Sequence, residues 1–264
     1  SADFHELRSA FWEILNQAAE KERVVLLLDA LNEFERTPPA TNLTWLPELL
    51  PSNVRLIATA IPCAVAAAMA ARADCSEQTL APLSREQSRE IAAHLCSRSH
   101  KELNAEVTAA LMDKKRPDGS TAASNPLWLS MAIEELLMLD AADFEQAHKS
   151  YAGSDDRKIV LFMLNMVSEM PPGTRELYAY LLDRMETTYG KESVRAFAEL
   201  IAISRSGWRR SDLDAMGPKL CGEKWDPLQL AVLRRGFRTH VIQRGDPVRY
   251  DFYHVQMREA EIGR

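Results

Sequence analysis

The chain has 264 residues, of which 46% are hydrophobic and 27% charged, a balance that is typical of a globular protein and excludes disorder as its main state. This length predicts about two domains, and no apolar run approaches the roughly 20 residues needed to cross a bilayer. The four cysteines show no Cys-x-x-Cys spacing and the first residues carry no signal peptide, so we expect a cytoplasmic protein without membrane association.

The first part of the chain alternates helical and extended patterns. Apolar residues recur at helical spacing over 3–20, and the run 24–28 is apolar at every position, which predicts a strand buried on both faces of a parallel sheet. Further elements are predicted as a helix over 42–50, a strand over 53–60, a helix over 64–73 and an extended piece over 79–83. The alternation predicts an α/β domain over residues 1–83, with helices on both faces of its sheet.

The pattern becomes helical after residue 83. A capping box formed by Ser84 and Gln87 predicts a helix through residue 96. Two more helices, over 104–113 and 127–139, complete a helical subdomain predicted for residues 84–156. The fold class expected for the whole chain is thus α/β followed by mostly α.

The last part, residues 157–264, is predicted to form a winged-helix domain. It contains helical patterns over 159–169, 174–189, 193–203 and 227–235, and a short helix with Ser211 as its N-cap. Two strands over 239–243 and 248–253 follow, joined by an Arg-Gly-Asp-Pro turn. Residues 205–264 hold 12 basic and 8 acidic side chains, whereas the rest of the chain is acidic and brings the net charge to −6.

Two carboxylates stand out at the end of the first strand. Asp29 follows the buried strand directly, at the edge of a parallel sheet where ligands bind, and Glu33 comes four residues later. Hydrolysis of a phosphoanhydride uses such a pair, because one carboxylate holds Mg²⁺ and the other orients the attacking water. The alternative is a strand end whose acids are only solvated.

Four segments in order resemble the STAND NTPases of the NACHT-like branch, which are signalling ATPases related to the AAA+ class. Residues 23–35, RVVLLLDALNEFE, resemble the Walker B segment, and residues 53–62, NVRLIATAIP, resemble the sensor 1 strand. Residues 124–129, SNPLWL, resemble the proline motif, and residues 250–259, YDFYHVQMRE, resemble the end of the winged helix. Together these segments extend the resemblance over nearly the whole chain.

The resemblance implies a role for five residues. Asp29 would hold Mg²⁺ and Glu33 would activate water. Thr59 would sense the γ-phosphate of ATP, Pro126 would pack on adenine, and His254 would contact the phosphates of ADP in the resting state. The function implied is an ATP/ADP-gated switch, in which the nucleotide-binding module self-associates and controls an attached effector.

The chain departs from the family pattern at three places. Asn32 precedes Glu33 where relatives often have aspartate, and Ile61 stands where many have arginine. No GxxxxGK[ST] motif occurs, although this loop supplies the phosphate-binding amides and lysine. We therefore expect the chain to begin after the P-loop of a longer protein, which would also carry effector or sensor domains. The P-loop strand would lie between the sensor 1 strand and residues 79–83, and this chain alone would not hydrolyse ATP.

Other interpretations of these residues remain open. Thr59 can be an ordinary strand residue, Pro126 the first residue of a helix, and His254 a histidine within a domain interface. The basic and aromatic stretches 208–210 and 234–238 would suit phosphate and stacking contacts with nucleic acid, although we do not expect nucleic acid to be the main partner. The alternative functions are a winged-helix transcriptional regulator that binds DNA and a degenerate scaffold that binds no nucleotide.

Overall fold

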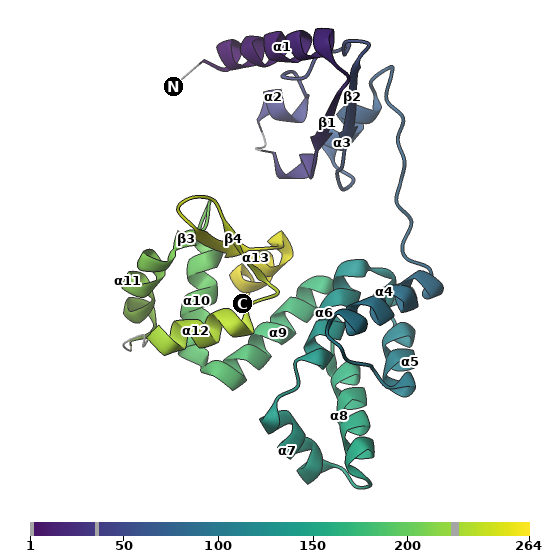
Figure 1. Ribbon diagram of the computed structural model, residues 1–264, viewed down its shortest axis with the longest axis vertical. Coiled ribbons are helices and arrows are strands. Elements are labelled where there is room, and N and C mark those ends of the chain that lie inside the picture. The colour runs from purple at the N-terminus through teal and green to yellow at the C-terminus, as the bar shows by residue number, and fades with distance from the viewer. Residues whose placement is uncertain (1–2, 35–36, 223–226) are drawn as a thin grey trace. The chain divides into compact units, whose positions relative to one another are not determined.

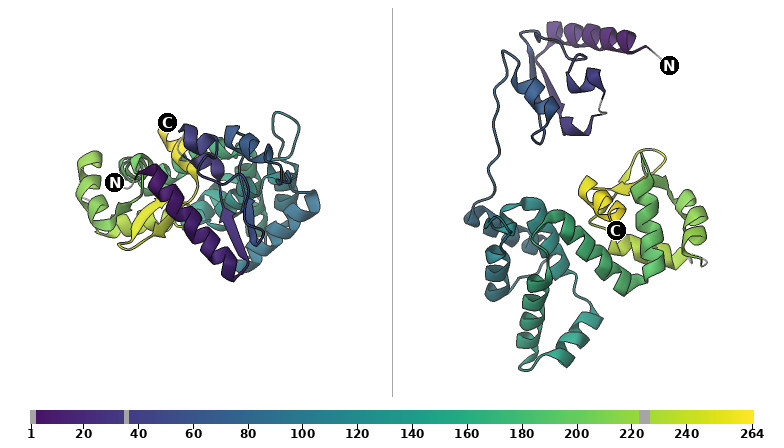
Figure 2. Two further views of the ribbon diagram at one scale, coloured as in Figure 1. Left: turned by 90° about the horizontal axis from the view of Figure 1, so that it is seen from above. Right: turned by 180° about the vertical axis from the view of Figure 1, so that it is seen from behind.

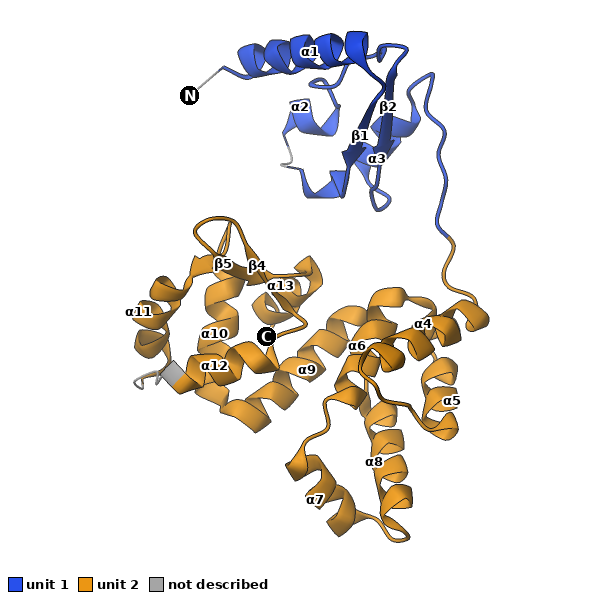
Figure 3. Cartoon of the chain, viewed as in Figure 1, with its two compact units in different colours: residues 1–80 blue, residues 81–264 orange. Residues whose placement is uncertain are grey.

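The computed structural model describes residues 3–34, 37–222 and 227–264. The chain divides into two compact units, the first ending at Leu80 and the second running from Ala81 to Arg264 (Figure 3). The predicted end of the α/β domain, residue 83, lies three residues beyond this division. In the described part of the chain, no helix is both long and apolar enough to span a membrane.

The first unit contains a sheet of two parallel strands and one long helix (Figures 1 and 2). In the sheet, Val24 lies opposite Val54 and Leu28 opposite Ala58. Helix α1 covers one face through Leu15, which is buried with Val54 in a small apolar cluster. The elements are α1 (Phe4–Lys21), β1 (Val24–Leu28), the 3₁₀ helix η1 (Leu31–Glu33), α2 (Pro38–Thr41), β2 (Val54–Ala58) and α3 (Ala64–Ala70).

The other face of this sheet is open, so the prediction of a strand buried on both faces is wrong. Val25, Leu27 and Ile57 are 48%, 73% and 57% exposed. These positions alternate with the residues that face α1, and within the described ranges neither a helix covers them nor a strand pairs with the outer edge of β2. Residues 79–83, predicted to be extended, form no strand.

The helix predicted over residues 42–50 is also wrong, because this segment consists of turns. Pro47 would interrupt a helix here, since it lacks an amide proton and restricts the residue before it. Leu43 adopts a left-handed conformation with φ 54°. The segment is held by packing: the indole ring of Trp45 lies 5.8 Å from the ring of Phe34 and 6.3 Å from that of Phe11, measured between centroids.

The second unit begins with a cluster of helices (Figure 1). The predicted capping box is confirmed, because the Gln87 amide donates to Ser84 Oγ and the Ser84 amide donates to Gln87 Oε1. Helix α7, which begins after Asp140, was not predicted. The elements of this part are α4 (Arg85–Arg98), α5 (Ala105–Asp113), the 3₁₀ helix η2 (Ala122–Ser124), α6 (Pro126–Leu137), α7 (Ala141–Ser150) and α8 (Asp155–Glu169).

The unit ends with further helices and an antiparallel sheet in the order β3-β5-β4. The predicted hairpin is present as β4 and β5, with Val241 opposite Phe252. Ser211 is not an N-cap, because α11 begins at Arg210 and the Asp212 carboxylate accepts the Arg209 amide. The elements are α9 (Thr174–Tyr189), α10 (Lys191–Ile203), β3 (Trp208–Arg209), α11 (Arg210–Cys221), α12 (Pro227–Gly236), β4 (Val241–Arg244), β5 (Arg249–Phe252) and the unpredicted α13 (Val255–Ile262).

One apolar core runs through the whole second unit, from α4 to α13. The largest fully buried side chains in it include Trp128, Tyr178, Phe197 and Phe237. Arg258 of α13 adds a polar link, because its guanidinium donates to the carbonyl oxygen of Ala202 at the end of α10 and forms a 2.6 Å ion pair with Asp251 of β5. The end of the hairpin is thereby fixed to α10, which sets the position of the residues between β5 and α13.

Candidate functional site

In the first unit, the two strands bring Asp29 and Thr59 together at their carboxyl ends. The register pairs Leu28 with Ala58, so the next residue of each strand lies at the same edge of the sheet. Thr59 Oγ1 donates to Asp29 Oδ1 over 2.5 Å and accepts the Ala30 amide over 2.9 Å. Ala30 has a left-handed φ of 53°, so the chain turns sharply directly after the aspartate.

Glu33 and Asn32 lie on the short helix that follows this turn. Asn32 Nδ2 donates to Glu33 Oε1 over 3.3 Å, while Asn32 Oδ1 accepts the Ile61 amide over the same distance. The Asn32 side chain thus links the loop after β1 to the loop after β2. Asp29 and Glu33 are both exposed, which leaves their carboxylates accessible to a ligand.

These oxygen donors fit a Mg²⁺ ion that is shared with a phosphate ligand. Magnesium in phosphate sites is held by one or two carboxylates and completes its shell with water and phosphate oxygens. Asp29 and Glu33 supply two carboxylates on neighbouring turns. In the described residues, no group of three or more His, Cys, Asp or Glu side chains could hold a metal by itself, so the phosphate would be required.

In the second unit, Pro126 is the first residue of α6. Asn125 caps this helix by accepting the Trp128 amide over 3.0 Å, and the Trp128 indole donates to the Pro171 carbonyl oxygen over 2.8 Å. The proline therefore has the structural role that its position alone predicted. Pro126 is also exposed, so its ring is accessible.

His254 lies between β5 and α13. Its ring is in edge contact with the ring of Tyr253, with centroids 4.5 Å apart. The imidazole does not cap α13, and burial lowers its pKa. A neighbouring phosphate would raise that pKa, because the negative charge favours the protonated ring.

One cavity of about 220 Å³ brings the beginning of α6 close to His254. Leu127, the residue after Pro126, lies in its wall together with His254. The remaining lining residues come from α6, α9 and the segment around the hairpin, namely Ser130, Met131, Glu134, Tyr178, Thr239, His240 and Tyr253. Sequence reasoning gave a role only to His254 among them. Leu127 and Tyr253 lie within the quoted motifs without a role of their own, and the others belong to no local motif.

His240, in the wall of this cavity, predicts a dependence of stability on pH. It is only 5% exposed, and burial, together with the charge of a protonated His254, lowers its pKa from 6.5 to about 4. The unfolded chain therefore binds a proton between pH 6.5 and 4 that the folded chain does not. The neutral His240 ring therefore contributes about 3 kcal/mol to the free energy of unfolding. This contribution is fully present above pH 6.5 and is lost as the pH falls toward 4.

Urea denaturation at a series of pH values measures this effect, with His240→Gln as the comparison. The variant lacks the titrating ring, so its free energy of unfolding should fall less steeply between pH 6.5 and 4. Parallel curves for the two proteins would show that His240 is not responsible.

Several basic and aromatic residues of the last sixty are engaged inside the second unit. The Trp208 indole donates to the Leu200 carbonyl oxygen and Arg234 lies 5.0 Å above the ring of Tyr250, whereas Arg210 pairs with Asp214 of the same helix at the surface. The charge surplus of this region therefore serves in part to hold the unit together.

Comparisons with known proteins relate part of the chain to a NACHT protein. NACHT and WD repeat domain-containing protein 2 of Mus musculus is 38% identical over 58 residues, which is 22% of this chain and 3% of that protein. A TPR repeat-containing protein of Dictyostelium discoideum is 22% identical over 221 residues, or 83% of this chain and 12% of that protein. The chain thus spans a small part of the length of both relatives. No protein-family model and no solved structure matches it.

Proposed function

We propose that this chain is part of an ATP/ADP-gated signalling switch of the STAND class. The observation that carries the proposal is the bond between Asp29 and Thr59, which joins the carboxyl ends of two neighbouring parallel strands. Ligands bind at this edge of open α/β sheets. The similarity of 58 residues to a NACHT protein supports the same function.

In the first unit, Asp29 would hold Mg²⁺, which when bound neutralises charge on the phosphates. Glu33 would orient and deprotonate the attacking water, since its carboxylate is exposed one turn beyond Asp29. Thr59 would sense the γ-phosphate, because its hydroxyl already links Asp29 to the backbone of the next turn. These groups act by positioning and by electrostatics, as phosphoryl transfer requires.

In the second unit, Pro126 would pack on adenine and His254 would contact the phosphates of ADP. The exposed Pro126 ring supports this assignment, and so does the closeness of the half-buried His254 to the beginning of α6, where Leu127 shares a cavity wall with it. The phosphates would contact the part of His254 that faces solvent, outside this cavity. The arrangement makes the unit a sensor, because His254 would stabilise only the resting form that holds ADP. The repeat modules named in the two relatives suit effector or sensor parts of a complete protein.

His254→Ala in the complete protein tests the switch. A hydrogen bond to a charged group contributes about 1.5–3 kcal/mol, so its loss should raise the open population about 10- to 150-fold. We expect the variant to oligomerise without a trigger, as measured by light scattering together with the content of bound nucleotide. Ser130→Ala, in the same cavity wall, is the control. A His254→Ala protein that is less stable but still monomeric and ADP-bound would contradict the proposal.

A further inference from the structure

The cavity beside α6 is lined by four rings. The rings of Tyr178 and His240 meet edge to face with centroids 5.7 Å apart, and those of Tyr253 and His254 meet in the same way at 4.5 Å. The Tyr253 amide donates to the His240 carbonyl oxygen over 2.8 Å, which fixes one pair against the other. The two pairs come from α9 and from both ends of the β4–β5 hairpin, so only the folded unit assembles them.

The wall of the cavity contains a carboxyl group. Glu134 of α6 is the one acidic residue in its lining, and no lysine or arginine is present among the described residues that form its wall. Burial raises the pKa of Glu134 and outweighs the Thr239 side chain and the charges of Arg238 and Arg98, which lower it. Burial also lowers the pKa of both histidines, so their rings are neutral at pH 7 and add no positive charge.

The buried hydroxyl of Tyr178 is a second feature of the cavity wall. Tyr178 is fully buried, and its oxygen bonds to no group in the described part of the chain. Buried hydroxyls are normally paired with protein or with a bound molecule, so an orphan in a cavity wall indicates a ligand. The sequence holds six tyrosines, and nothing in the local pattern marks this one.

We propose that this cavity binds an organic ammonium group. Aromatic faces attract such cations, and a carboxylate in the same wall supplies the counter-charge. An N–H group of the ammonium would donate to Tyr178 Oη or to Glu134, while its carbon substituents would contact Met131 and Leu127. A phosphate or carboxylate would not suit the interior beside Glu134, because no lysine or arginine among the described residues lines the wall.

The size of the cavity limits the ligand to a small group. Pockets for drug-sized molecules measure about 300–1,000 Å³, whereas this one measures about 220 Å³. It would hold the head of an alkylamine, either a free amine or the side chain of a lysine in another polypeptide. The same chemistry serves both sources, and the experiment must separate them.

This inference does not rest on the proposed switch. The switch uses His254 at the cavity wall, whereas the ammonium site depends on Glu134 and Tyr178, for which the switch has no role. Loss of amine binding in Glu134→Gln would leave the nucleotide dependence of oligomerisation unchanged. Conversely, a protein that fails to respond to nucleotide could still bind an amine.

Calorimetric titration of the 264-residue chain with n-butylammonium chloride at pH 7 tests the site, with n-butanol as the uncharged analogue. We expect saturable binding of one n-butylammonium per chain. The alcohol should bind at least about 10-fold more weakly, because it lacks the hydrogen bond from a charged group to the cavity wall. A peptide with a single lysine forms the second arm. Tighter binding of the peptide would assign the site to a protein side chain, and tighter binding of the amine would assign it to a free metabolite.

Two variants locate the binding. Glu134→Gln should weaken the binding of n-butylammonium about 10- to 150-fold, and Tyr178→Phe should weaken it about 2- to 10-fold. Tyr178→Phe should not lower the melting temperature, since the phenyl ring keeps the packing. Glu145→Gln removes the same charge from an exposed residue of α7 and should bind like the parent. Equal affinity for the amine and the alcohol, no saturable binding, or unchanged affinity in Glu134→Gln would overturn the proposal.

Discussion

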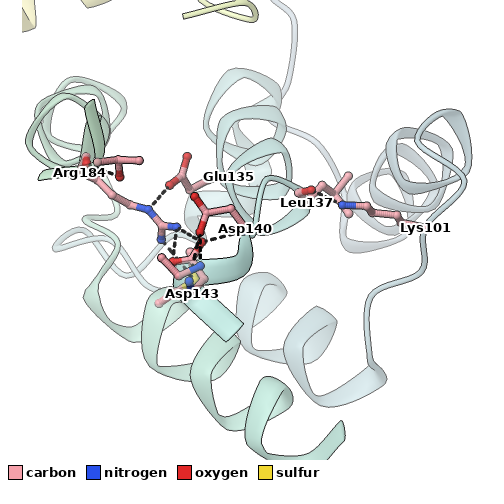
Figure 4. A network of polar contacts seen from close by, with 9 residues as sticks. Lys101, Glu135, Leu137, Asp140, Asp143 and Arg184 are labelled. Atoms are coloured by element: carbon pink, nitrogen blue, oxygen red, sulfur yellow. Dashed lines mark hydrogen bonds and ion pairs between the residues drawn. The ribbon is translucent and has the colours of Figure 1, made fainter. Parts of the chain in front are cut away.

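Arg184→Ala is expected to lower the free energy of unfolding of the second unit by about 3–5 kcal/mol. Figure 4 shows why: the Arg184 guanidinium of α9 lies between the carboxylates of Glu135 and Asp143. Its Nε is 2.7 Å from Glu135 Oε1, and Nη2 lies 3.0 Å from both oxygens of Asp143. One side chain thereby joins α6, α7 and α9.

The size of the effect follows from the burial of Glu135. The side chain of Glu135 is only 12% exposed, and burial raises its pKa although the charge of Arg184 opposes this. Without the guanidinium, a buried carboxylate remains without a counter-ion, and this is the most unfavourable way to break an ion pair. Asp143 also loses a partner, while it still accepts the Asp140 amide at the start of α7.

Urea denaturation measures the change, with Arg85→Ala as the matched control. Arg85 pairs with Asp113 over 2.5 Å, but both side chains are largely exposed and screened by water, so we expect only a small loss. The double variant Arg184→Met, Glu135→Leu should recover most of the stability, because no unpaired charge remains. An Arg184→Ala protein as stable as Arg85→Ala would show that the ion pairs of Arg184 with Glu135 and Asp143 contribute no more to stability than an exposed pair.

Glu33→Gln in the complete protein is expected to slow nucleotide hydrolysis about 10²- to 10⁴-fold, the usual effect of removing a general base. Glutamine keeps the shape of the side chain and its oxygen can still accept from Asn32 Nδ2, the bond observed at 3.3 Å. The turn after β1 should therefore keep its conformation, and nucleotide binding should survive. Single-turnover hydrolysis and equilibrium nucleotide binding measure the two properties separately.

Glu48→Gln is a suitable control for this experiment. Glu48 is an exposed acid of the same unit in the turn segment before β2, and it bonds to none of the groups near Asp29 that the structure describes. Its loss should leave turnover unchanged. Equal turnover of Glu33→Gln and the parent protein, with nucleotide bound by both, would remove Glu33 from the mechanism.

Part of this structure follows from local sequence. The strand over 24–28 is apolar at every position and ends at Asp29, so its place and the exposure of the carboxylate could be predicted before any tertiary contact was known. The helix after Ser84 follows from its capping box. Such features depend on neighbours within one turn or one strand, which is the range that a sequence pattern describes.

Contacts between residues far apart in the sequence determine the features that the local pattern did not predict. The segment 42–50 was expected to be a helix, yet Pro47 and the packing of Trp45 between two phenylalanine rings give a series of turns. The apolar run 24–28 predicts a strand with two apolar faces, but whether other elements cover both faces depends on how many layers of helices pack on the sheet. Among the described residues, α1 packs against one face of the sheet, and Leu27 on the other face remains exposed.

Of the two candidate sites, the site of the first unit is visible in the local sequence, whereas the cavity of the second unit exists only in the folded structure. The ends of two parallel strands bring Asp29 and Thr59 to one edge, and Glu33 follows four residues after Asp29, so a local pattern was enough to indicate where these three residues lie. Glu134, Tyr178 and His240 come from three distant segments and share a cavity only because α6, α9 and the β4–β5 hairpin pack together. Their chemistry depends on burial, which shifts the pKa of a group that would be ordinary in water, and burial is a property of the folded unit.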